Sequence, residues 1–516
     1  MTRTELSKAM DQERRMAAIT NACAEFDHWD TERHNIELQL GCSNVLCLVL
    51  SMTDNEDEIR MICAALEMVY RASTEAVHKT FQEVGPAVVP LLLKVLERCE
   101  HSMLKHAEIS ILNISKVLLY FSRVSDLRTL LAKHKGMLSA LTRVSTATLD
   151  PDARVLRMRV IANISNSEAN KMMMISFPGL TDSILKIAAL DLSEGAREYA
   201  SASLMDLASS PKTQEVMANN DRLLATLVKL SVTDSKEETR EYSITAMQNL
   251  AFSKENRSRL VTFSDGVVIE ALKKALSTDK NDKSRRRAAG ALTNLACEET
   301  ANLMAGHEGL LQVLSKVAVQ DKNNDVQKRS SLALTKIASA CANDSTYIKV
   351  LMNALVKAAS SANSTGIPAV FRVKAREASM RVEMARIAGI LETLADMSVS
   401  KGYSAKDKEN SMRAIMHLTN ETENRKIMCN KVILNALVEA SNLESPGSKE
   451  IRDSAVIAIE RLATEVTNRR YLARHDGMLV AIAKATEREA KSELAGEKQS
   501  QPRLAKQLLL SLLLAM

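Results

Sequence analysis

Apolar and small residues recur along the chain at a spacing that is typical of one face of an α-helix. In each copy they lie six, three and two positions before a common reference position, and one and two positions after it. This spacing predicts a series of long helices, each with one buried face. The reference position is occupied in turn by Asn163, Asp206, Asn249, Asn294, Lys336, His417 and Arg461, with weaker copies at Met68 and Tyr120.

The copies are evenly spaced. Successive reference positions in the main series are 43, 43, 45, 42, 81 and 44 residues apart. A constant period indicates a repeated structural unit, and an interval of 81 is close to two periods. We therefore expect an irregular unit at residues 360–400, in which Gly366-Ile367-Pro368 breaks the helix and either bends the array or carries a loop.

The residues that flank each copy also repeat. Asn170, Asn256, Asn424 and Asn468 lie seven positions after the reference, where Asn is expected to cap the next helix by accepting from its free N–H groups. About sixteen positions after the reference, a glycine is expected to supply a left-handed turn between two helices. Each unit is therefore predicted to hold a short helix, a second helix and a long third helix. These glycines are Gly136, Gly179, Gly266, Gly309 and Gly477.

With these features the chain resembles the armadillo-repeat family, and residues 288–317 (AAGALTNLACEETANLMAGHEGLLQVLSKV) match that family's pattern best. The resemblance implies an all-α fold, a right-handed armadillo-type superhelical solenoid of about ten three-helix repeats, in which neighbouring units complete each other's core. We assign residues 51–486 to the array, 1–50 to an N-terminal helical cap and 487–516 to a C-terminal capping helix. The apolar last segment, 507–516, has the alternative of binding a partner or a membrane surface.

In armadillo proteins the third helices line a concave groove, and the family's Asn at the reference position bonds the main chain of an extended peptide. The resemblance implies this role for Asn163, Asn249 and Asn294, and it puts Lys336 and His417 in the same groove. An Asn amide both donates and accepts, which matches the free groups of an extended chain. The alternative is that these Asn residues are structural.

Positions seven and eight before the reference are expected to face the groove as well. The surface should therefore be basic around Asn294 and Lys336, with more acidic surface on both sides. A basic centre suits an acidic or phosphorylated peptide, whereas the alternative is a solvated helix face of mixed sign. The expected groove residues are Tyr199, Tyr242, Arg286, Arg287, Lys328 and Arg329, with Glu198, Glu241, Glu409 and Asp453 as the acidic ones.

Two further positions narrow the interpretation. A mostly basic series nine positions before the reference is interpreted as contacts between repeats: Arg154, Arg197, Arg240, Arg285, Gln327, Lys408 and Arg452. Importin-alpha-type carriers place a Trp one turn before the Asn, but these positions hold other residues here, and the one tryptophan, Trp29, precedes the array. Without tryptophan rings to pack against the lysine side chains of a nuclear localisation signal, binding of such signals as in importin-alpha is not expected.

The amino-acid composition argues against several classes of protein. The apolar content of 46% excludes disorder, and 3% aromatic residues disfavour a β-sandwich. With 69 basic against 63 acidic residues, the net charge of +6 does not predict nucleic-acid binding.

Eight scattered cysteines without a CxxC pair are expected to be reduced core residues. No secretory signal or transmembrane segment is expected, so we predict an intracellular protein, cytoplasmic, nuclear or both.

No catalytic signature is present in the sequence. Phosphate-binding loops, dinucleotide-binding motifs and nucleophile elbows do not occur, and no histidines have the spacing of metal ligands. We expect no enzyme activity, cofactor, metal or small-molecule substrate. The leading hypothesis is a scaffold or adaptor that binds an extended or acidic segment of a partner protein in its groove. The alternatives are a karyopherin-like transport receptor and a substrate adaptor in a chaperone or ubiquitin-ligase complex.

Overall fold

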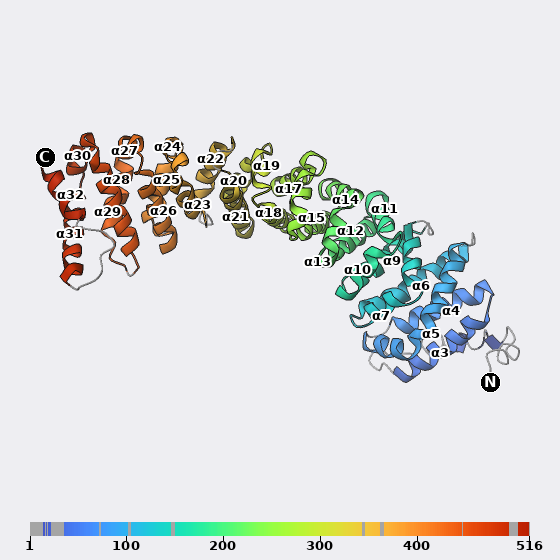
Figure 1. Cartoon of the computed structure of the whole chain (residues 1–516). Coiled ribbons are helices and arrows are strands. Elements are labelled where there is room, and N and C mark those ends of the chain that lie inside the picture. Colours follow the sequence, from blue (N-terminus) through green and yellow to red (C-terminus); the bar gives the residue numbers. More distant parts are fainter. Residues whose placement is uncertain are drawn as a thin grey trace. The chain divides into compact units, whose positions relative to one another are not determined.

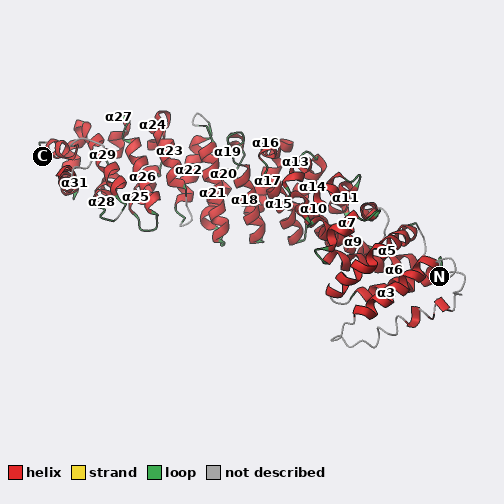
Figure 2. Ribbon diagram, turned by 60° about the horizontal axis from the view of Figure 1, so that its bottom comes forward, coloured by secondary structure: helices red, strands yellow, loops and turns green. Residues whose placement is uncertain are grey.

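The structure is a computed structural model, and all the secondary structure that it describes is helical (Figure 1, Figure 2). This confirms the predicted all-α class. The chain divides into two compact units, Met1–Asn256 and Arg257–Met516. The residues described are 14–15, 17, 19–21, 36–71, 74–101, 105–145, 150–342, 346–361, 366–445, 447–494 and 504–514.

The first unit begins with longer helices and continues as regular layers. From α7 onwards each layer holds a short helix, a second helix and a long third helix, as predicted. The helices are α3 (Ile36–Met52), α4 (Glu56–Tyr70), α5 (Thr74–Glu100), α6 (Lys105–Arg123), α7 (Leu127–Lys133), α8 (Met137–Thr142), the 3-10 turn η1 (Arg143–Ser145), α9 (Pro151–Ser165), α10 (Glu168–Ser176), α11 (Leu180–Leu190), α12 (Glu194–Ala208), α13 (Pro211–Ala218), α14 (Asp221–Thr233) and α15 (Glu237–Leu250).

The second unit repeats this order, except that its layer at residues 346–376 shows only a second and a third helix among the described residues. Helix α16 (Lys254–Thr262) spans the division between the units. The helices that follow are η2 (Phe263–Gly266), α17 (Val267–Thr278), α18 (Asp282–Leu295), α19 (Ala301–Gly306), α20 (Leu310–Gln320), α21 (Asn324–Ala340), α22 (Ile348–Ala359), α23 (Ile367–Arg376), α24 (Ala378–Arg386), α25 (Ile390–Val399), α26 (Ala405–Leu418), α27 (Thr422–Met428), α28 (Lys431–Ser441), α29 (Lys449–Thr464), α30 (Val466–Arg474), α31 (Met478–Leu494) and α32 (Leu504–Leu513).

Third helices of neighbouring layers pack on one another inside each unit. In the first unit α9 packs on α6 and α12, and α12 packs on α15; in the second, α18 packs on α21, and α23 and α29 both pack on α26. Small side chains such as Ala200 and Ala288 are fully buried on these helices. Because small residues allow helix axes to approach closely, the repeated Ala and Ser positions build the stack.

The predicted glycine turns are present. Gly136, Gly179, Gly266, Gly309 and Gly477 all have φ between 73° and 89° and stand directly before the second helix of their layer. A residue with a Cβ atom adopts this left-handed backbone only at a cost, which explains why glycine recurs at this point.

The Asn residues seven positions after the reference do not cap helices as predicted. Asn170 lies inside α10, and its Nδ2 donates to the carbonyl oxygens of Ile164 at 3.0 Å and Arg128 at 3.2 Å. Asn256, Asn424 and Asn468 make the equivalent pair of bonds. The N-cap prediction was therefore wrong: the amide joins the end of the third helix that precedes it, where carbonyls lack an α-helical donor, to the short helix of that same preceding layer.

The irregular unit contains a helix where a break was expected. Gly366 adopts φ 89° as the N-cap of α23, and Pro368 lies in the first turn, where a missing N–H costs nothing. Gly366-Ile367-Pro368 therefore begins a helix and does not break one. The buried residues Val370, Phe371 and Ala375 place the reference position of this layer at Val373.

The layer of α23 is shortened but still follows the repeat. Val373 lies 37 residues after Lys336 and 44 before His417, and Gly389, sixteen positions later, has φ 85° directly before α25. The position after the reference, which is usually apolar, holds Lys374. This lysine is 4% exposed, and its Nζ donates to the Cys341 carbonyl oxygen at 2.6 Å. The shorter interval and the buried lysine together hide this copy in the sequence.

The last helix packs on the array. Leu508 and Leu512 of α32 are buried against α29, α30 and α31, whereas Leu510, Leu513 and Leu514 are exposed. The domain limits at residues 50 and 486 remain predictions. Among the described helices, no single one is both long and apolar enough to cross a bilayer; only α10 and α11, taken together across a 91° bend, meet that length and composition.

The cysteines fit the prediction of reduced core residues. Cys42 is buried, Cys47, Cys63, Cys99 and Cys341 are buried free thiols, and Cys297 and Cys429 are half-buried free thiols. Burial raises the pKa of the Cys47 thiol to about 12, which keeps it protonated and unreactive. Cys23 and Trp29 lie outside the described residues.

Candidate functional site

The reference residues occupy equivalent places on the third helices. Asn163 and Asn249 lie near the ends of α9 and α15 in the first unit, and both are half-buried. In the second unit Asn294, His417 and Arg461 are half-buried, and Lys336 is exposed. Because consecutive third helices pack side by side within a unit, these side chains share one surface of that unit, which we call its third-helix face.

Several reference side chains reach back to the preceding third helix. Asn249 Nδ2 donates to the Met205 carbonyl oxygen at 3.2 Å, Lys336 Nζ to that of Thr293 at 3.4 Å, and Arg461 Nη1 to that of Met416 at 2.8 Å. Each acceptor stands in the last turn of a helix, where carbonyls have no helical donor.

This contact gives the reference position a structural role, as the alternative interpretation proposed. Asn163 makes a related bond, since its Nδ2 donates to Ser122 Oγ at 2.9 Å. An Asn amide has two N–H donors and an arginine side chain has five, and the bond to the preceding helix uses one of them. The remaining donors can therefore still bind a ligand. A structural and a binding role are therefore compatible at this position.

The third-helix face of the first unit is acidic and carries tyrosines. Tyr199 and Tyr242 are half-buried, and the Arg159 guanidinium lies 5.5 Å from the centre of the Tyr199 ring. Glu198 forms an ion pair with Lys236. These groups are already engaged by neighbours within the unit, which leaves less of their charge and ring surface for a ligand.

Asp206 stands at the reference position between Asn163 and Asn249. Burial raises the pKa of its carboxyl to about 6, against the opposing effects of Lys171, a hydrogen bond from Asn166, and Arg128. An ionised carboxylate offers no donor, so this residue departs from the amides on either side.

The third-helix face of the second unit begins with a cluster of cations, which we call the basic strip: Arg286, Arg287, Lys328, Arg329 and Lys336. Lys328 and Arg329 on α21 are exposed, whereas Arg286 and Arg287 on α18 are half-buried. Arg286 Nη1 lies 3.7 Å from Asp325 Oδ2, and both side chains remain partly exposed. The strip has the positive sign that the sequence predicted around Asn294 and Lys336.

Beyond Lys336 the face holds a second group of cations that sequence reasoning missed. Arg372 and Arg376 lie on α23, whose copy of the repeat was not recognised, and they join His417 and Arg461. The expectation of a more acidic surface on this side left them out. The glycine and apolar pair at Gly389-Ile390-Leu391 is the sequence signal that would have located this layer.

Burial lowers the pKa of His417 below its usual range, and surrounding guanidinium groups lower it further: those of Arg381, Arg461, Arg376 and Arg372. A histidine among so many cations is therefore held neutral.

The basic series nine positions before the reference joins successive layers. The Nε of Arg154, Arg197 and Arg285 lies 2.7, 2.6 and 2.7 Å from a carboxylate of Asp191, Asp234 and Asp321, in the turn before the next third helix. The interpretation of this series as contacts between repeats is confirmed for these three arginines.

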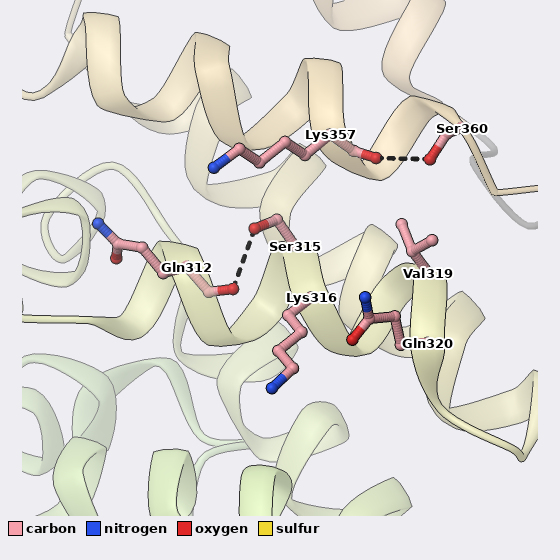
Figure 3. Close-up of a pocket in the computed structure, with 7 residues that line it drawn as sticks. All are labelled: Gln312, Ser315, Lys316, Val319, Gln320, Lys357 and Ser360. Atoms are coloured by element: carbon pink, nitrogen blue, oxygen red, sulfur yellow. Dashed lines mark hydrogen bonds between the residues drawn. The ribbon is translucent and has the colours of Figure 1, made fainter.

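Two depressions in the surface lie away from the third helices. One of about 490 Å³ is lined by α20 and α22 and includes Gln312, Lys316 and Lys357 (Figure 3). Another, of about 320 Å³, includes Arg143, Asp182 and Arg222 in the first unit. The described part of the chain has no group of three His, Cys, Asp or Glu side chains placed to hold a metal ion.

Comparison with protein-family models finds no match, and comparison with curated protein sequences finds none either. Solved structures do match. A chain from a study of the interaction between cadherin and beta-catenin, and of a phosphorylation switch that controls it, is 14% identical, covers 100% of this chain and 99% of its own length, and gives a TM-score of 0.55. An engineered protein is 17% identical, covers 94% and 99%, and gives 0.52.

A designed armadillo repeat protein in complex with the peptide (KR)4 is also similar, with 21% identity over 48% of this chain and 99% of its own, and a TM-score of 0.39. At such identities a likeness concerns the fold and not the activity. The match along the whole chain agrees with the layers, glycine turns and third-helix contacts described above. The chain therefore has an armadillo-type fold.

Proposed function

We propose that this protein is a non-catalytic scaffold that binds an acidic segment of a partner protein on the third-helix face of its second unit. Armadillo-type folds present long rigid surfaces, and the similar structure that includes beta-catenin concerns a protein–protein interaction. This likeness supports a protein-binding role in general, and the charge of the face supports the choice of partner.

The basic strip carries the proposal. Lys328, Arg329 and Lys336 are exposed on one helix, and α21 packs directly on α18, which adds Arg286 and Arg287. The ion pair of Arg286 with Asp325 is long and exposed, so it neutralises little of this charge. A patch of one sign on rigid helices steers an oppositely charged segment and fixes its position.

The spacing of the layers limits the form of the bound segment. Neighbouring helices lie about 8–10 Å apart. A polyproline-II strand rises about 3.1 Å per residue with three residues per turn, so every third side chain returns to the same side after about 9 Å. An extended segment with an acidic residue at every third position therefore matches successive third helices.

The proposal is tested with a fluorescent peptide of about twelve residues that has Glu at every third position, compared with the same peptide carrying Gln. Fluorescence anisotropy should show binding of the Glu peptide only. The triple variant Lys328→Glu, Arg329→Glu, Lys336→Glu should weaken binding at least about tenfold, because each reversal replaces attraction with repulsion.

A matched control reverses two exposed lysines on the opposite set of helices, Lys316→Glu and Lys357→Glu, which line the depression in Figure 3. The control should bind the Glu peptide nearly as well as the unaltered protein. Equal loss in both variants would show that only net charge matters, and no binding in any form would exclude the proposed function.

The transport-receptor and adaptor alternatives differ from this proposal in the identity of the partner. No contact described above favours either, so both stay hypotheses that a partner-identification experiment must separate.

A further inference from the structure

We propose that the part of the third-helix face formed by α23, α26 and α29 binds a phosphorylated side chain of the partner segment, through Arg372, Arg376, His417 and Arg461. We call these four residues the phosphate site. The inference rests on the proposed function, since it adds a specific subsite to the acidic segment that the basic strip would bind.

The packing of three third helices brings these residues together. Arg372 and Arg376 are one turn apart on α23, so their side chains leave the helix on the same side. Helix α23 packs on α26, which carries His417, and α29 packs on the other side of α26. Arg461 of α29 reaches across to the Met416 carbonyl oxygen at 2.8 Å, which places its guanidinium against the helical turn of His417.

Neighbouring arginines are occupied by the protein itself. Arg381 Nη1 bonds Glu421 at 2.8 Å while its Nε bonds the Ala375 carbonyl oxygen, and Arg413 Nη2 lies 3.0 Å from Glu409. In the described part of the chain, by contrast, no carboxylate forms an ion pair with Arg372, Arg376 or Arg461.

One carboxylate does adjoin the phosphate site. Glu460 precedes Arg461 on α29 and is half-buried, and burial raises the pKa of its carboxyl. Three guanidinium groups against this one partly buried acid leave an excess of positive charge at the site.

This excess suits a phosphate better than a carboxylate. A phosphorylated side chain carries about 1.5–2 negative charges and three acceptor oxygens, and guanidinium groups bind such oxygens in pairs. Arg461 keeps four N–H donors after its bond to the Met416 carbonyl oxygen. Arg372 is half-buried and Arg376 is exposed, and both lie on the same side of α23. A neutral His417 adds an N–H donor without the cost of a further charge.

The surroundings favour a single phosphate over a nucleic-acid strand. A strand would need a continuous basic track with exposed aromatic rings for its bases. Phe371, the aromatic residue within α23, is fully buried, and the acids Glu409 and Glu421 flank the cluster. These acids would oppose the binding of a long polyanion along the face.

The experiment compares the Glu-rich peptide with versions that carry one added Ser, phosphoserine or Glu at either end, titrated into the full chain. We expect the phosphoserine peptide with the correct polarity to bind about tenfold tighter than the Ser peptide, which corresponds to one or two charge-assisted bonds. The Glu version should recover only a small part of this gain.

The double variant Arg372→Gln, Arg376→Gln should abolish the gain from phosphorylation and leave binding of the Ser peptide within about twofold, because these residues lie outside the basic strip. Arg386→Gln, an exposed arginine of α24 paired with Glu423, is the matched control and should change neither. If thermal melting shows that the double variant is unfolded, His417→Gln replaces it and should lower the gain severalfold.

The outcomes separate this inference from the proposed function. If the Ser peptide binds at the basic strip but phosphoserine adds nothing, or its gain survives the double variant, the phosphate site is wrong and the scaffold proposal stands. If only the phosphoserine peptide binds, and the double variant abolishes this, the phosphate site stands without the basic strip. A single-stranded RNA of equal charge that binds more tightly, with the same sensitivity to the variants, would overturn the inference in favour of nucleic acid.

Discussion

The two units build the same layers but differ in the charge that their third-helix faces display. In the first unit, several charged groups are buried or ion-paired. Glu100 and Arg157 are 0% and 1% exposed, and Glu198 forms an ion pair with Lys236. In the second unit, Lys328 and Arg329 are displayed on the third-helix face. The scaffold therefore does not dictate the charge of its surface, which is free to differ between units.

The reference position shows how this freedom arises. Asn249, Lys336 and Arg461 each donate to a carbonyl in the last turn of the preceding third helix, where carbonyls lack an α-helical donor. An amide does so without charge, whereas lysine and arginine do so and still carry a positive charge. Val373 and an ionised Asp206 offer no such donor, and burial raises the pKa of the Asp206 carboxyl.

The largest effect is expected from the buried charges of the first unit. Glu100 accepts from Arg157 through one oxygen and from Arg143 through the other, the latter at 2.6 Å. Glu100→Ala would leave Arg157 buried without a partner, which costs about 3–5 kcal/mol of the free energy of unfolding. Hydrogen exchange should show this loss in α5 and α9 only. A destabilisation as small as that of an exposed lysine variant such as Lys328→Ala would contradict the contrast between the units.

The second prediction concerns an amide that both units use in the same way. Asn424→Ala removes both bonds of the Nδ2, to the Leu418 and Arg381 carbonyl oxygens, from a site that is 0% exposed. We expect a loss of about 2 kcal/mol, because two acceptors lose their donor. Asn170→Ala in the first unit is the matched comparison and should cost a similar amount in urea unfolding. A loss in one unit only would show that this contact is not a shared part of the layer.

A smaller effect is expected at Asp206, and it depends on pH. The pKa of its carboxyl in the folded protein, about 6, lies above that of an unfolded chain, so between roughly pH 4 and 6 the folded state binds the proton more readily. Stability contributed by this group is present below pH 4 and is lost as the pH rises through 6.

Asp206→Asn should remove this fall in stability. Because the side chain is only half-buried, the gain over the unaltered protein at pH 7.5 should be on the order of 1 kcal/mol, with little difference at pH 4. Urea unfolding of both proteins at the two pH values measures it. Parallel pH profiles would mean that the carboxyl does not titrate differently in the folded state.

The smallest effect is expected when charge is removed from the reference position of the second unit. Lys336→Met keeps the length of the side chain but removes its long bond to the Thr293 carbonyl oxygen, which is worth about 0.5–1 kcal/mol. Binding of an acidic peptide should fall more than stability does. If both change in proportion, the lysine serves the layer and not the ligand.

Much of the fold follows from the sequence because burial repeats with a fixed period. The glycines Gly136 and Gly309 locate the turns, since their left-handed backbone leaves a clear mark in the sequence. The direction of hydrogen bonding leaves no such mark: Asn170 was expected to accept from a helix start and instead donates to carbonyl oxygens at the end of α9 and in the first turn of α7.

The candidate site was predicted less completely for two physical reasons. The layer of α23 is shorter than the period and buries Lys374 where an apolar residue is usual, so Arg372 and Arg376 lay outside the aligned positions. The ion pair of Glu100 and Arg157 joins residues 57 positions apart with no periodic signal. The basic strip was visible because its residues fall in register with the repeat.

The reference side chains donate to the preceding layer and not to the following one, so these hydrogen bonds all run in one direction along the chain. The donor that covers the end of a third helix comes from the following layer, as Arg461 does for α26. Truncation from the carboxyl side therefore uncovers the carbonyls at that helix end, whereas truncation from the amino side removes the arginines that pair with Asp191, Asp234 and Asp321 of the following layer. A fragment should therefore lose a different contact at each cut: a donor to helix-end carbonyls at its carboxyl end, and the cation partner of a buried aspartate at its amino end.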